Sequence, residues 1–171
     1  MLRLLRDRPK EVQNLPRNAF PIERGDRKGL AMPDRISIGV DAESGLATVT
    51  VQGELNEEGV RGFFDAVFRH PDFKPGMHVL ADARDASMDL SAAAMARLID
   101  FFKRHRETRG LGKDVIVVGS DVDYGIGRMI EAYTDEHLPY DVRVFRSMRE
   151  GLHWLGLKSE SATGGEETEP A

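Results

Sequence analysis

Residues 77–102 read MHVLADARDASMDLSAAAMARLIDFF, and this stretch decides the fold. It predicts an apolar strand at residues 78–81, a polar segment at 82–89 and then an amphipathic helix. Open α/β sheets use the same succession to place polar groups at the carboxyl edge of their strands, where ligands and partners dock. The helix should bury side chains at helical spacing, those of Met95, Leu98, Ile99 and Phe102. The stretch therefore predicts an α/β fold and locates its working edge.

Alternating β-branched residues predict an antiparallel hairpin upstream of this stretch. Its strands are expected at residues 36–40 and 46–51, joined by a turn that contains Gly45. Asn56 is the expected N-cap of the helix that follows, because its side-chain oxygen can accept an N–H of the first turn. One apolar stripe marks the buried face of that helix: Val60, Phe63, Phe64 and Val67.

Downstream, the near-continuous apolar run at residues 114–119 predicts a central strand that is buried on both faces. The next helix should turn one apolar face inward, made of Ile126, Met129, Ile130 and Tyr133. A last strand is expected at residues 142–145, and Ser147 and Glu150 have the spacing of a capping box. The order β-β-α-β-α-β-α-β-α predicts a single α/β domain over residues 35–157. It should have a mostly parallel sheet of four to five strands, an N-terminal antiparallel hairpin and helices packed on the sheet.

Both ends of the chain lack any sustained apolar period. We expect residues 1–34 to be a flexible N-terminal extension. Two interpretations of this extension stay open: a regulatory arm, or upstream sequence ahead of a start at Met32. Residues 158–171 are rich in Ser, Gly and Glu, and we expect them to form a disordered acidic tail.

The composition argues against several classes of protein. With 171 residues, 40% of them hydrophobic and 31% charged, the chain is typical of one soluble domain. The absence of cysteine excludes disulfides, thiolate metal sites and thiol catalysis, and it fits a cytoplasmic protein. No apolar run approaches the about 20 residues that cross a bilayer, so we do not expect a membrane-spanning protein. The net charge of -5 argues against nucleic acid as a partner.

The corner between the third strand and the second helix reads ASMDLSA at residues 86–92. Together with the element order, it resembles the STAS family of anti-sigma-factor antagonists over roughly residues 36–156. Segments 124–129, 144–147 and 154–156 resemble the bacterial STAS-like branch that is related to CRAL-TRIO lipid-binding domains. The resemblance implies a non-enzymatic regulatory module whose protein partner is an anti-sigma factor or a kinase-type regulator.

The resemblance also bears on phosphorylation. In regulated antagonists this corner reads Asp-Ser-Ser-Gly, and the first serine is phosphorylated to release the partner. Here Asp89 and Ser91 match the flanking positions, but Leu90 stands in place of the first serine and Ala92 in place of the glycine. The resemblance therefore implies a module without the usual serine phosphoswitch. Ser87 or Ser91 could serve as a fallback acceptor, although a serine at a helix start is more often a cap.

Three hypotheses about function stay open. The first is a protein-interaction domain whose corner contacts the partner through Asp85, Ser87, Asp89, Leu90 and Ser91. Because a strand-to-helix connection runs over the surface, we expect Asp85, Ser87, Asp89 and Ser91 to be exposed, and Asp89 is a candidate cap of the helix. The chain could also assemble as a homodimer.

The second hypothesis is a domain that binds a lipid or another small apolar ligand. Its pocket would lie between sheet and helices and would be lined by Phe63, Phe64, Phe101 and Phe102, which could equally be plain core. The third is a weak enzyme that uses aspartates at the sheet edge to hold Mg²⁺, namely Asp82, Asp85, Asp89, Asp121 and Asp123. The histidines lack the spacing of a zinc site. We expect no enzyme, no cofactor and no metal.

Overall fold

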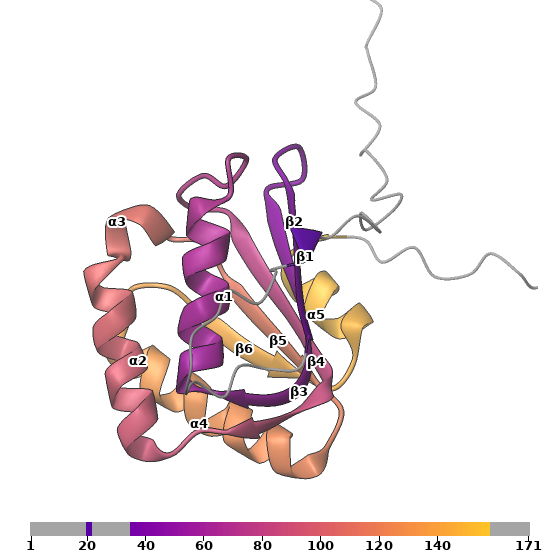
Figure 1. Ribbon diagram of the computed structural model, residues 1–171, viewed down its shortest axis with the longest axis vertical. Coiled ribbons are helices and arrows are strands. Elements are labelled where there is room, and N and C mark those ends of the chain that lie inside the picture. The colour runs from indigo at the N-terminus through magenta and orange to yellow at the C-terminus, as the bar shows by residue number, and fades with distance from the viewer. Residues whose placement is uncertain (1–19, 22–34, 158–171) are drawn as a thin grey trace, which may run out of the picture.

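The computed structural model describes residues 20–21 and 35–157 (Figure 1). Its strands are β1 (Phe20–Pro21), β2 (Arg35–Asp41), β3 (Leu46–Asn56), β4 (His78–Asp89), β5 (Asp114–Val118) and β6 (Val142–Phe145). Its helices are α1 (Glu57–Arg69), α2 (Ala92–Arg104), α3 (Arg106–Arg109), α4 (Asp121–His137) and α5 (Met148–Trp154). The element order expected from the sequence is confirmed, and the short β1 and α3 are additions to it.

The strands form one six-stranded sheet in the order β1-β2-β3-β4-β5-β6. β1 pairs antiparallel with β2, and β2 with β3, whereas β3 to β6 run parallel. The predicted hairpin and the mostly parallel sheet are therefore confirmed. The sheet has one strand more than expected, because residues 20–21 of the predicted N-terminal extension pair with β2. The rest of that extension and the predicted acidic tail lie outside the described residues.

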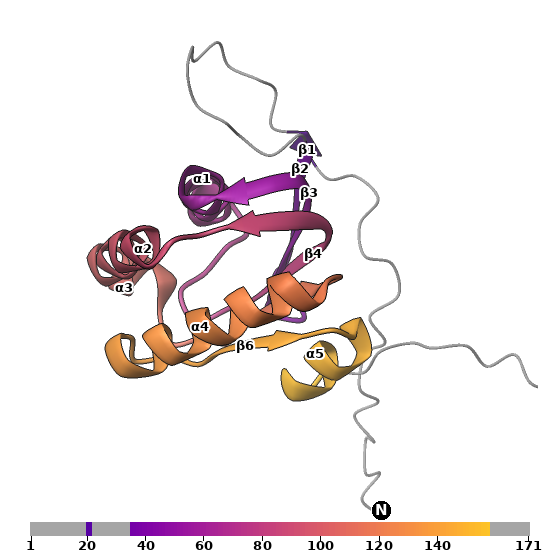
Figure 2. The same ribbon diagram turned by 90° about the horizontal axis from the view of Figure 1, so that it is seen from below.

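Helices cover both faces of the parallel part of the sheet (Figure 2). α1, α2 and α4 lie on one face, where Ala47, Val49 and Val51 of β3 join the main apolar core. α5 lies on the other face, where Leu155 packs with Leu80 of β4. Successive residues of a strand point to opposite faces, so a strand that is covered on both sides has to be apolar throughout. This explains the near-continuous apolar run of β5.

The first and the last helix begin in different ways. Asn56 caps α1 as predicted, because its Oδ1 accepts the N–H of Gly59 at 3.0 Å. The capping box predicted for Ser147 and Glu150 is wrong, since the Ser147 side chain makes no capping hydrogen bond. Instead, apolar side chains of α5 and of Leu155, the residue that follows it, hold the helix on the sheet.

Ile126, Ile130 and Tyr133 of α4 are partly buried and pack against the main core, as predicted, but the helix also turns polar residues toward the sheet. Its buried residues are Asp123, Gly127, Glu131 and Thr134. Met129, which was predicted on the inner face, is 45% exposed, so that prediction is wrong. The reason is the close approach of α4 to β6: a Cβ on Gly127 would lie 2.5 Å from Cγ2 of Val144. Glu131 also accepts the N–H of Val144 at 2.6 Å and so covers the outer strand of the sheet.

A buried ion pair joins α3, β5 and the entry into β4. Arg109 is 0% exposed, and its guanidinium donates to the carbonyl oxygens of Met77 at 2.8 Å and Gly112 at 3.0 Å. It also forms an ion pair with Asp114, which is 6% exposed, and lies 4.8 Å from the ring centroid of Tyr140. Burial raises the pKa of the Asp114 carboxyl, and the charge of Arg109 opposes that rise. The Arg109–Asp114 ion pair therefore has a structural role: it holds α3 and the amino ends of β4 and β5 together.

His78 lies beside this ion pair, and we expect it to make the stability of the fold depend on pH. Its Nδ1 accepts the backbone N–H of Lys113 at 3.0 Å, which requires a ring nitrogen without a proton. Burial lowers the pKa of His78 below its usual 6.5, and the charges of Lys113 and Arg109 lower it further. In the unfolded chain the imidazole regains the usual value, so the unfolded chain binds the proton first as the pH falls. The contribution of His78 to stability is therefore complete above pH 6.5 and is lost as the pH falls toward the folded pKa.

We expect the melting temperature to fall as the pH is lowered from 7.5 to 5, and this fall to be smaller in His78→Asn. The Asn Oδ1 can take over the place of the imidazole Nδ1 as acceptor, but it cannot be protonated in this range. The measurement is a series of thermal melts over that pH range. His153→Asn, at an exposed histidine of α5, is the control and should keep the wild-type dependence. An unchanged dependence in His78→Asn would assign the pH effect to other groups.

Candidate functional site

The polar segment at 82–89, expected to connect the third strand to the second helix, is the second half of strand β4. The carboxyl ends of β3 and β4 extend beyond the neighbouring strands. On the β5 side, the last residue that pairs with β4 is Val118, opposite Ala83. Beyond this point residues 52–56 of β3 pair in parallel with residues 85–89 of β4. We call these two segments the ribbon. The expectation of a strand-to-helix connection over these residues is wrong, because β3 is longer than predicted and supplies backbone partners for the polar residues.

A bulge sets which side chains of the ribbon face outward. Between the pairs Thr50–Asp82 and Gln52–Asp85, β4 contains one more residue than β3. An extra residue of this kind shifts the alternation of the strand by one position. Beyond it, Asp85, Ser87 and Asp89 are exposed, whereas Met88 is buried. The ribbon therefore presents a polar outer face and an apolar inner face.

The outer face of the ribbon carries exposed carboxylates. Ser87 lies directly opposite Glu54 in the register and between Asp85 and Asp89 along β4. Glu54, Asp85 and Asp89 are exposed, and none of them forms a salt bridge with another residue of the described part of the chain. The exposure predicted for Asp85, Ser87, Asp89 and Ser91 is confirmed. Their role in binding a partner stays a prediction.

Leu90 and Ser91 connect the ribbon to α2. Leu90, which we grouped with the contact residues, is 7% exposed and belongs to the main core, so its side chain does not reach the surface. Ser91 is the N-cap of α2, since its Oγ accepts the N–H of Ala94 at 3.2 Å. The prediction of Asp89 as the cap is wrong, because β4 extends through Asp89 and the helix begins only at Ala92.

The buried carboxylate of Asp123 anchors the ribbon to α4. Its Oδ1 accepts the backbone N–H of Met88 at 2.7 Å, and its Oδ2 accepts the hydroxyl proton of Ser120. The backbone N–H of Asp123 in turn donates to Ser120 Oγ at 3.1 Å, so the same pair forms the N-cap of α4. Asp123 is 5% exposed. One side chain thus holds both the start of a helix and the middle of the ribbon.

Three of the five aspartates of the metal hypothesis are held by separate partners, and Asp85 and Asp89 point to solvent. Asp82 binds the Arg84 guanidinium through two hydrogen bonds of 2.8 Å, and Asp121 pairs with Arg146. Asp123 serves the backbone as described above. Within residues 20–21 and 35–157, no three His, Asp or Glu side chains are grouped so that they could hold a metal ion.

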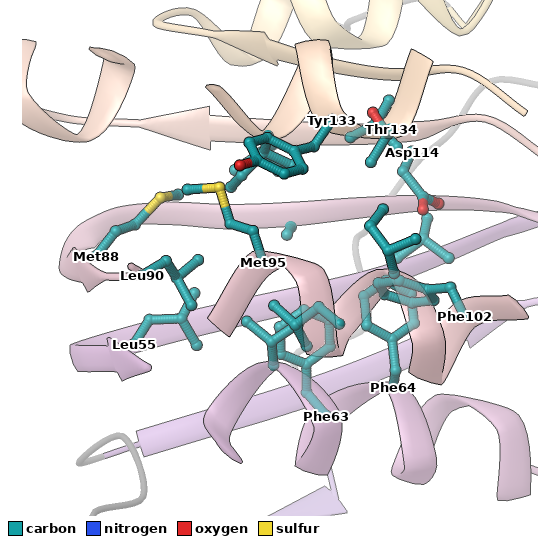
Figure 3. Close-up of a pocket in the computed structure, with 18 of the residues that line it drawn as sticks. Leu55, Phe63, Phe64, Met88, Leu90, Met95, Phe102, Asp114, Tyr133 and Thr134 are labelled. Atoms are coloured by element: carbon teal, nitrogen blue, oxygen red, sulfur yellow. The ribbon is translucent and has the colours of Figure 1, made fainter. Parts of the chain in front are cut away.

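A cavity of about 80 Å³ lies between the sheet and helices α1, α2 and α4 (Figure 3). Phe63, Phe64 and Phe102 line it, as predicted, whereas Phe101 does not. Phe101 packs against Phe68 and His105 instead. Natural cores contain few such cavities, so this one is a candidate binding site.

The inner face of the ribbon forms one end of this cavity. Leu55 of β3 and Met88 of β4 are cross-strand neighbours, and both line the cavity together with Leu90. Figure 3 shows these three side chains together at one end, with Met95 of α2 nearby. The ribbon therefore has a cavity on one side and the exposed carboxylates on the other. The sequence does not indicate Met88 and Leu55 as lining residues, because it predicts a strand-to-helix connection where the ribbon lies.

Comparisons with known proteins identify similar solved structures. No family model and no curated protein sequence matches the chain. A crystal structure of an uncharacterized protein of the DUF3478 family with a SpoIIAA-like fold, from Shewanella loihica PV-4, is similar to it. The two share 17% sequence identity and a TM-score of 0.47, and the match covers 77% of this chain and 99% of that one. The assignment of a function rests on the residues of this chain. Among its described residues, every helix is too short or too polar to cross a membrane.

Proposed function

We propose that this chain is a non-enzymatic regulatory module of the STAS-like type. In this proposal it binds a protein partner through the outer face of the ribbon and the start of α2. The proposal rests on one observation: the backbone of the ribbon is fixed, whereas its outer side chains are exposed. Its backbone is fixed by the ladder with β3, by Asp123 and by the buried Met88, while Asp85, Ser87 and Asp89 point to solvent. A fixed backbone with unengaged polar side chains suits recognition, because little order has to be created on binding.

The chemistry of the surface favours a partner with basic residues. The carboxylates of Glu54, Asp85 and Asp89 form no salt bridges in the described structure, so they are available to Lys or Arg from another molecule. The first turns of α2 extend the surface with the exposed, small side chains of Ala92 and Ala93. The resemblance to STAS domains suggests an anti-sigma factor or a kinase-type regulator as the partner.

Three features support a module without the serine phosphoswitch. Leu90 has no hydroxyl and is buried. Ser91 uses its hydroxyl to cap α2. A phosphate on Ser87 would lie among the carboxylates of Glu54, Asp85 and Asp89, and like charges oppose its addition. We therefore expect the partner surface to be present at all times.

Asp85→Lys should reduce capture of the partner at least tenfold and change the free energy of unfolding by less than about 1 kcal/mol, as is usual for exposed residues. The test is a pull-down from host lysate with quantitative mass spectrometry, alongside urea melts. Glu107→Lys makes the same charge change at an exposed residue of α3, away from the ribbon, and serves as the matched control. Proteins that are lost with Asp85→Lys and kept with Glu107→Lys are partners of the ribbon. If both variants capture the same set, the interaction surface lies elsewhere.

A further inference from the structure

We infer that the cavity between the sheet and helices α1, α2 and α4 is a binding site for a small uncharged molecule. The expected ligand is an aromatic ring or a short alkyl chain with at most one hydrogen-bonding group. The inference is independent of the partner surface proposed above. At about 80 Å³ the cavity is well below the about 300–1,000 Å³ of drug-sized pockets, so a whole lipid does not fit.

The polar atoms at the cavity decide the charge of the ligand. Only Asp114, Tyr133 and Thr134 interrupt an otherwise apolar lining. The Thr134 hydroxyl donates to the carbonyl oxygen of Glu131 at 2.9 Å, and the Asp114 carboxylate is held by Arg109. The Tyr133 hydroxyl forms no hydrogen bond with another described residue, so it can serve one polar group of a ligand. A carboxylate or phosphate would find no cation among the described lining residues and would lose its hydration, whereas an uncharged ring meets no such cost.

Entry to the cavity is expected between α4 and β5. Ile116 lies on β5 between two neighbouring strands, yet it is only half-buried, as are Ile130 and Tyr133 of α4. Solvent therefore reaches the sheet at this place. Met88 and Met95 line the same cavity, and unbranched thioether side chains adapt to ligands of different shape. The cavity can thus enlarge on binding without a change of backbone.

Methyl resonances of methionine report on the site directly. The chain has seven methionines, of which Met88 and Met95 line the cavity, whereas Met77 and Met129 do not. We expect toluene to shift the ¹³C-methyl signals of Met88 and Met95 in a saturable manner and to leave those of Met77 and Met129 in place. Benzoate, the same ring with a carboxylate, is the matched control ligand and should shift none of them. Equal shifts of all methionines, shifts with benzoate as large as with toluene, or no shifts at all would overturn the inference.

Variants on the cavity wall separate binding from stability. Ala81→Val adds two methyl groups to the lining and should weaken toluene binding at least about tenfold, because the added volume takes the place of the ligand. Val60→Ala enlarges the cavity and should strengthen binding. Val67→Ala makes the same change at a buried residue of the same helix that does not line the cavity, and should leave binding unchanged. If Ala81→Val does not fold, the Val60 and Val67 pair decides: equal affinities in both would contradict the site.

Discussion

Replacement of Arg109 by methionine is expected to lower the free energy of unfolding by about 3–5 kcal/mol, the largest effect of any substitution we consider. Arg109 is fully buried, and its loss leaves the carboxylate of Asp114 without its cation in the core. The carbonyl oxygens of Met77 and Gly112 lose their donor in the same step. An uncompensated buried charge is expensive because water no longer solvates it. Urea melts of the wild type and of Arg109→Met measure the difference.

The double variant Arg109→Met/Asp114→Leu tests this explanation. It removes both charges and keeps apolar volume, and such replacements of buried pairs are often close to neutral. We expect it to regain most of the stability lost in Arg109→Met, although the two carbonyl oxygens remain without their donor. If the double variant is less stable than Arg109→Met, the role of Arg109 lies in its hydrogen bonds to the backbone rather than in the pairing of charges.

Alternating patterns and short apolar runs in the sequence were sufficient to predict most of the sheet. The hairpin and the strands at residues 78–81, 114–119 and 142–145 were recognisable because one or both faces of each strand pack on helices. The buried stripes of α1 and α2 followed from the same argument and are confirmed. Local hydrophobic periodicity therefore carries the information on which the core depends.

The sequence pattern did not reveal the ribbon as part of the sheet, because a bulge interrupts the alternation of β4. Residues 85–90 alternate polar and apolar, which is a strand pattern, but the extra residue of β4 near Asp82 breaks the phase with residues 78–81. A pattern that changes phase is easily taken for the end of a strand. Its pairing also depends on residues 52–56, far away in the sequence, which local reasoning cannot supply. The exposure of Asp85 and Asp89 could be predicted, but the rigidity of their backbone could not.

The inner face of α4 was predicted only in part: Ile126, Ile130 and Tyr133 pack against the core, but Met129 is exposed, and buried polar residues of the helix serve the backbone. Hydrophobicity placed Met129 inside, whereas the helix buries Asp123 and Glu131, whose carboxylates accept N–H groups of the ribbon and of β6. Such partners are set by tertiary structure and leave no periodic signal. Through these two carboxylates, α4 is hydrogen-bonded both to the ribbon, which carries the candidate partner surface, and to β6. Asp123 matters more for the proposed function, because it is the one that contacts the ribbon.

Asp123→Ala is expected to lower the free energy of unfolding by about 2–3 kcal/mol, because it removes a charge-assisted hydrogen bond and leaves the buried N–H of Met88 without a partner. It also removes an acceptor from Ser120 at the N-cap of α4. Urea melts measure the loss. Asp121→Ala, two residues earlier, removes an exposed carboxylate paired with Arg146 and should cost under about 1 kcal/mol.

The two variants should differ in the ribbon as well as in stability. Amide hydrogen exchange of Met88 should become faster in Asp123→Ala by more than the loss of global stability accounts for, because its N–H then opens with the ribbon alone. Exchange in β5 should follow global stability only. If Met88 and β5 change in parallel, Asp123 stabilises the whole fold and does not hold the ribbon in particular. If they diverge, capture of the partner should fall in Asp123→Ala and persist in Asp121→Ala, since a ribbon without its anchor presents Asp85 and Asp89 on a backbone that is no longer fixed.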